Sequence, residues 1–117
     1  MQIEGPAKRL AIHIGEDDIW HGKPLYEAIL ELLRAEGCAG ATVTRGIAGF
    51  GKSSRIHTTH LLRFSQDLPV VVELVDHAER IEAVLDKLEE MVGGGLITVS
   101  DVRVIKYSHG EAPGGDS

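Results

Sequence analysis

Aromatic residues and cysteine are scarce in this chain of 117 residues. One Trp, two Tyr and two Phe leave the core to aliphatic side chains and provide few of the aromatic platforms on which RNA-binding domains stack bases. The net charge of −6 also disfavours contact with the phosphate backbone of nucleic acids. We therefore expect no nucleic-acid partner. The single cysteine, Cys38, excludes an intrachain disulfide and is typical of a reducing compartment.

Long apolar runs are absent too. No stretch reaches the roughly 18 apolar residues of a membrane-spanning helix, and the N-terminus lacks the apolar segment of a signal peptide. The sequence therefore predicts a cytoplasmic protein that does not insert into a membrane. Its length fits one domain, which we place at residues 8–107. The polar residues 1–7, and residues 108–117 with their glycine, proline and acidic content, are predicted to be disordered tails.

Hydrophobic periodicity predicts four strands and two helices. Asp76 and Glu79 have the spacing of a capping pair for the second helix. The alternation of the last strand changes phase between Val99 and Val102, which predicts a bulge near Ser100. The predicted elements are a strand at 8–15, a helix at 24–36, strands at 41–47 and 68–75, a helix at 77–92 and a strand at 96–107.

The order β-α-β-β-α-β predicts an α+β fold, the ferredoxin-like sandwich. Right-handed crossovers then place both helices on one face of a four-stranded antiparallel sheet. The opposite face should expose Ala11, Val71, Val75 and Val43 or its neighbours. Burying one valine is worth about 1.5–3 kcal/mol, so we expect another subunit to cover this face.

A basic, glycine-rich stretch interrupts the acidic chain. No Asp or Glu occurs from Gly37 to Gln66, whereas four basic residues do. Glycines let backbone N–H groups approach a ligand closely, and such a window is typical of an anion site. A flexible, solvated hairpin tip is the plainer alternative. The candidate ligand-binding residues are Arg45, Gly46, Gly49, Gly51, Lys52, Ser53, Arg55 and His57.

The same stretch matches a nucleotide-binding pattern. Residues 46–53 satisfy G-x-x-x-x-G-K-[ST], and the apolar run ending at Asp76 resembles the strand whose Asp holds magnesium in P-loop enzymes. Residues 53–64, however, alternate in a manner that favours an extended segment over the required helix. Too few elements remain for a nucleotide-hydrolase sheet. A P-loop-like hydrolase is therefore the alternative, and we assign no catalytic residue and no cofactor.

Two groups of side chains suggest metal binding. His57 and His60 would lie on opposite faces of an extended segment and form a poor chelate. The acidic residues 16–18 with His21 could bind a divalent ion, but a solvated acidic loop is the simpler interpretation. We therefore predict no metal ligand.

Five segments together resemble a known family: GE at 15–16, GKPLYEAI at 22–29, GATVTRGIAGFG at 40–51, SRIH at 54–57 and DLPVVVE at 67–73. They are similar to the family called domain of unknown function 190. The resemblance covers about residues 8–107, and the run from Gly40 to His57 is its specific part. It implies a PII-like fold, in which ferredoxin-like subunits form trimers related in shape to the PII nitrogen regulatory proteins and to CutA.

The resemblance also implies a function in signalling or ligand sensing. In PII proteins nucleotide lies between subunits, against the base of a long mobile loop and against the loop after the second helix. The matching positions here are residues 45–57 and the run Gly93, Gly94 and Gly95. The resemblance implies a homotrimer that binds a small anionic ligand, with an adenine nucleotide as one candidate. It also implies that the 46–57 loop could contact a protein partner. The run 93–95 lacks the basic residue found there in PII proteins, and a metal-related protein like CutA remains a further alternative.

Overall fold

The computed structural model describes residues 3–49 and 67–108, which form one sheet, two helices and a small hairpin. The sheet has the order β4-β5-β1-β6, and every neighbouring pair of strands is antiparallel. The elements are β1 (Gly5–Gly15), β2 (Ile19–Trp20), β3 (Lys23–Pro24), α1 (Leu25–Ala35), β4 (Thr42–Arg45), β5 (Pro69–Asp76), α2 (Ala78–Met91) and β6 (Leu96–Val104).

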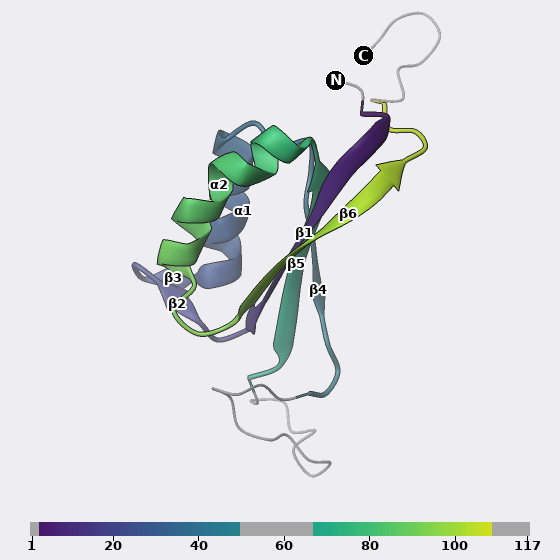
Figure 1. Cartoon of the computed structure of the whole chain (residues 1–117). Helices are drawn as coiled ribbons and strands as arrows, with labels where there is room; N and C mark the ends of the chain where they lie inside the picture. Colours follow the sequence, from purple (N-terminus) through teal and green to yellow (C-terminus); the bar gives the residue numbers. More distant parts are fainter. Residues whose placement is uncertain (1–2, 50–66, 109–117) are drawn as a thin grey trace, which may run out of the picture.

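Both helices cover the same face of the sheet (Figure 1). This arrangement confirms the predicted α+β, ferredoxin-like sandwich with its four-stranded antiparallel sheet. The hairpin of β2 and β3 precedes α1 and was not predicted, because two-residue strands leave no periodicity in a sequence. Neither of the two described helices is long and apolar enough to cross a membrane.

The core lies between the helices and the sheet. Residues of β5 alternate between fully buried and half-buried, so one face of the strand packs on the helices and the other does not. One subunit therefore leaves this face of β5 open, as the sequence predicted. The buried core residues are Leu10, Ile12, Ile14, Leu25, Ile29, Leu33, Val70, Val72, Leu74, Ile81, Val84 and Leu88.

Three of the four helix ends carry a proline or glycine that suits its position. Pro24 lies just before α1, and Gly37 takes the left-handed conformation (φ 82°) after its end. The run from Gly93 follows the end of α2. The predicted capping pair is wrong, because the N-cap of α2 is His77 and no side chain caps this helix. Asp76 lies one residue too early and has another role.

Several boundaries need correction. β1 begins at Gly5, and Ile3 is buried, so these residues belong to the folded domain and not to the predicted tail. β6 ends at Val104, and within the described residues it pairs with β1 in one unbroken register, so the predicted bulge near Ser100 is wrong. Val43 packs against the core, whereas its neighbours Thr42 and Thr44 share the open face with Glu73 and Val71.

Candidate functional site

The antiparallel sheet gathers two of the predicted ligand-binding segments at one of its ends. There β4 ends at Arg45, β1 ends at Gly15, and β5 and β6 begin. The segment from Arg45 to Gly49 and the run 93–95 therefore share this end. They leave from opposite edges, because β4 and β6 are the two outer strands. Three strand spacings separate these edges by roughly 14 Å, so one subunit does not bring the two segments together.

Arg45 is the predicted site residue with a clear electrostatic partner. Its Nη1 lies 3.3 Å from Oε2 of Glu16, and its side chain is 58% exposed. Glu16 is the less exposed partner, at 31%, and its backbone N–H donates to the carbonyl of Leu68. Arg45 is thus held at the end of β4 by a carboxylate from the loop after β1.

The two described glycines of the 46–53 pattern pack on Pro69. The N–H of Gly46 donates to the carbonyl of Pro69 at 2.7 Å. A Cβ on Gly46 would lie 2.9 Å from Cγ of that proline, and one on Gly49 would lie 3.2 Å from it. Gly46 has no side chain, and this allows the chain to pass close to β5. A flexible tip would not require a glycine at this position.

Carboxylates in the loops after β1 and before β5 bind backbone groups. Oδ2 of Asp18 accepts the N–H of Gly15 at 3.0 Å, and Oδ1 of Asp67 accepts the N–H of Asp17 at 2.8 Å. Asp67 was not among the predicted site residues. Its position could have been inferred from the sequence, since it immediately precedes a strand that starts where β1 ends.

The glycine run before β6 includes one position where the backbone is tightly packed. A Cβ on Gly95 would lie 2.5 Å from the carbonyl oxygen of His13, whereas one on Gly93 would meet nothing within 4 Å. All three glycines are exposed. Gly95 therefore allows the chain to enter β6 close to β1. Gly93 lies on the surface with free space around it. The remaining candidates, Gly51, Lys52, Ser53, Arg55 and His57, lie outside the described residues.

Asp76 occupies a position that argues against a P-loop enzyme. It lies at the far end of β5 from Pro69, which corresponds to roughly 23 Å along a strand of this length. Its side chain is fully buried, and its two oxygens accept the N–H groups of Ala39 and His77 at 2.8 and 2.7 Å. The carboxylate therefore stabilises the fold by binding backbone groups. The surrounding sheet is also antiparallel, whereas P-loop enzymes have a parallel sheet.

The open face of the sheet carries an ion pair that the sequence analysis missed. Arg9 donates to both carboxylate oxygens of Glu73, at 2.9 and 3.0 Å. These hydrogen bonds lower the pKa of Glu73 and raise the pKa of Arg9. The two residues lie on adjacent strands, two positions apart diagonally, so the pairing of β1 with β5 would have revealed them.

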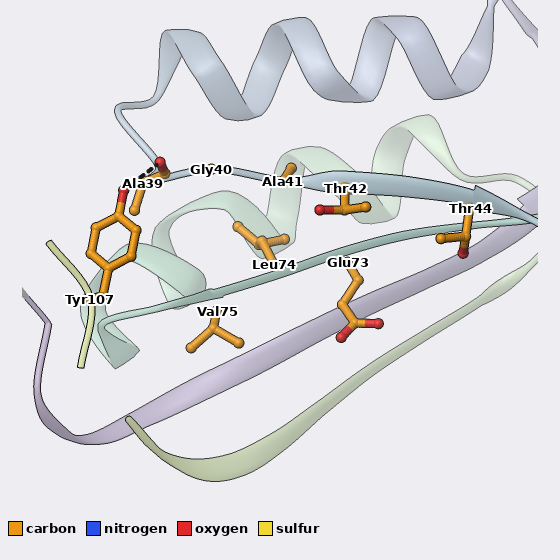
Figure 2. A pocket seen from close by; sticks show the side chains of 9 residues that line it. All are labelled: Ala39, Gly40, Ala41, Thr42, Thr44, Glu73, Leu74, Val75 and Tyr107. Atoms are coloured by element: carbon orange, nitrogen blue, oxygen red, sulfur yellow. Dashed lines mark hydrogen bonds between the residues drawn. The ribbon is translucent and has the colours of Figure 1, made fainter. Parts of the chain in front are cut away.

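A groove of about 450 Å³ lies beside this pair, where β4 begins (Figure 2). The hydroxyl of Tyr107 donates to the carbonyl of Ala39 at its rim, and Glu73 and Val75 lie within its lining. The other lining residues are Gly40, Ala41, Thr42, Thr44 and Leu74. Among the predicted ligand-binding residues that the structure describes, none lines this groove, which lies toward the other end of β5 from Arg45.

Comparison with known proteins identifies the family of this domain. The family model of DUF190, described as "Uncharacterized ACR", matches residues 7–104. The chain belongs to this family. It is 43% identical over 98 residues to a UPF0166 protein of Aquifex aeolicus, an alignment that covers 84% of this chain and 92% of that protein. The resemblance seen in the sequence is thereby confirmed.

Solved structures confirm the PII-like fold of this DUF190 protein. CPII, a nitrogen regulatory PII-like protein from Thiomonas intermedia K12 bound to ADP, AMP and bicarbonate, superposes with a TM-score of 0.66 at 20% identity, covering 89% of this chain and 91% of CPII. CutA from Synechococcus elongatus PCC7942 gives a TM-score of 0.55 at 13% identity, with 93% and 90% covered. At these identities the likeness establishes the fold alone.

Proposed function

We propose that this DUF190 protein is a trimeric, PII-like ligand sensor that binds a small anionic ligand near the base of the 46–57 loop. The observation that carries the proposal is the placement of Arg45, Gly46 and the run 93–95 at one end of the sheet. The PII-like protein CPII, which shares the fold, binds adenine nucleotides and bicarbonate. An adenine nucleotide is therefore the first ligand to test.

The ligand is proposed to lie between subunits. Within one subunit the base of the loop and the run 93–95 leave from opposite edges of the sheet, and a neighbouring copy can supply the missing half. Val71 and Val75 are half-buried on the open face, where another copy would remove them from water. From the sequence, Lys52 and Arg55 would add positive charge, and the 46–57 loop would contact a protein partner.

The proposal is for binding without catalysis. The position of Asp76 and the antiparallel sheet both argue against the alternative P-loop hydrolase. A metal-related function like that of CutA finds no specific support in the described residues.

The Arg45→Ala variant should bind ADP about tenfold more weakly than the wild type, because a hydrogen-bonded charge contact of about 1.4 kcal/mol would be lost. Lys52→Ala should weaken binding only a few-fold, since an exposed charge contributes about 0–1 kcal/mol. Titration calorimetry of both variants measures the difference. Arg103→Ala is the control, because Arg103 is exposed on β6 and pairs with Pro6 near the other end of β1.

An equal loss in all three variants would indicate nonspecific charge attraction and contradict a site at Arg45. ATP hydrolysis by the wild type that disappears in Lys52→Ala would favour the alternative function, a P-loop-like hydrolase.

A further inference from the structure

The ion pair of Arg45 with Glu16 bears directly on how an anion could bind. Nη1 of Arg45 lies 3.3 Å from Oε2 and 3.5 Å from Oε1 of Glu16. Glu16 is less exposed than Arg45, and its backbone is tied to Leu68 by a hydrogen bond of 2.8 Å. The backbone that carries this carboxylate is therefore fixed next to the guanidinium that we assign to the ligand.

Other acidic residues lie in the two loops that meet here, after β1 and before β5. Asp17 and Asp18 follow Glu16, Asp67 precedes Leu68, and the carboxylates of Asp18 and Asp67 accept backbone N–H groups. Glu16 is the acid that contacts Arg45. An anion that approaches Arg45 must displace the carboxylate of Glu16, which is already in place. A single negative charge gains little from this exchange, because it replaces one carboxylate by another.

We propose that Glu16 is an internal competitor for the anion site: it holds Arg45 when the site is empty and restricts binding to anions of more than one charge, such as phosphate esters. This inference rests on the proposed function. A phosphate group offers several oxygens and about two charges to a guanidinium, which can contact two of them at once. The gain over Glu16 comes from the second charge, since a carboxylate can also contact a guanidinium through two oxygens.

The test is a titration of the full chain with ADP as the polyvalent anion. Glu16→Gln keeps the size of the side chain and removes its charge, so it should bind ADP about two- to fivefold more tightly than the wild type, the range expected for a partly exposed ion pair. Glu36→Gln is a matched control: its carboxylate pairs with Lys87 and is 28% exposed, close to the 31% of Glu16. It lies at the C-terminal end of α1, away from Arg45, and should leave binding unchanged.

Two further measurements make the assignment specific. In the Arg45→Ala background, Glu16→Gln should give no comparable gain, because the competition requires the guanidinium. Acetate, a monoanion, should displace ADP from the wild type far less effectively than pyrophosphate does.

The outcomes separate the two proposals. If the wild type binds ADP and Glu16→Gln binds it equally well or more weakly, the competitor role is wrong and the proposed function stands. A gain that Glu36→Gln reproduces, or that persists without Arg45, would also overturn the competitor role. If neither the wild type nor Glu16→Gln binds ADP or pyrophosphate, both proposals fail. Binding that appears only in Glu16→Gln would support the competitor strongly.

Discussion

Replacing Asp76 with alanine is expected to lower the free energy of unfolding by about 3–5 kcal/mol, the range found when one partner of a buried charged network is removed. Asp76 is the one described polar residue that is buried completely. Its oxygens accept the N–H groups of Ala39 and His77, and Nε of Arg80 lies 3.8 Å from Oδ1. Alanine would leave the two N–H groups without their acceptor, and would remove the charge that Arg80 faces, in a site that excludes water.

The network explains the size of the effect. Asp76 connects the end of β5 to the segment that leads into β4, and Arg80 continues the connection to the carbonyl of Glu36. One substitution therefore loosens the approaches to two strands and the start of α2. Chemical denaturation with urea measures the loss.

Asp101→Ala is the control for this prediction, since Asp101 pairs with Lys8 but its side chain is 84% exposed. It should cost at most about 1 kcal/mol. Asp76→Asn, which keeps one acceptor oxygen, should lie between the two and remain measurable if the alanine variant does not fold. A loss below 1 kcal/mol in Asp76→Ala would show that the network does not stabilise the fold.

Replacing Val71 with lysine is expected to convert the proposed trimer to a monomer. Val71 lies on β5, between Thr44 of β4 and His13 of β1, on the face opposite the helices. It is half-buried in the single chain, so a lysine there can extend into water. In an interface the same ammonium group would lose its water, at a cost of several kcal/mol.

Light scattering checks this prediction. The wild type should give a mass close to three times 12.6 kDa, and Val71→Lys should give a mass close to that of one chain with an unchanged circular dichroism spectrum. Ala83→Lys, a change of the same kind on the exposed side of α2, should stay trimeric. A monomeric wild type would contradict the proposed trimer. A trimeric Val71→Lys variant would show that the subunits contact each other through another face.

Much of the fold could be predicted from local patterns. The two helices have apolar residues at helical spacing and clear stop signals, so their positions matched within about one turn. The order of the elements is compatible with few topologies. The right-handedness of crossover connections then selects the ferredoxin-like sandwich. The open face followed from the same argument, with Val71 and Val75 on it as expected. Ala11, which was also expected to be exposed there, is buried instead.

Pairing between distant segments could not be read from the chain. Asp76 has the spacing of a helix cap, but its oxygens bind Ala39, 37 positions earlier. Local sequence cannot reveal a partner that only the folded chain brings near. The absence of a bulge in β6 has a similar cause: Val99 to Val102 pair with residues 7–10 of β1 without a break, and this pairing is not visible in the sequence of β6 alone.

The sequence singled out Arg45, Gly46 and Gly93–Gly95 as candidate site residues. The fold places them at one end of the sheet. Their separation on opposite edges, and the pairing of Arg45 with Glu16, depend on strand order and on a contact across 29 positions. Charge counting marked this stretch as free of acids, although the fold places the acid loop of Glu16 beside it.

The central claim is that this DUF190 protein binds an anionic ligand at the loop base without transforming it. Titration calorimetry of the purified protein with ADP and ATP, with phosphate release followed in the same samples in the presence of magnesium, tests it most directly. The account predicts saturable binding, about one ligand per subunit, and no release of phosphate above the rate without protein. Steady phosphate release, or no binding of either nucleotide or of pyrophosphate, would contradict it.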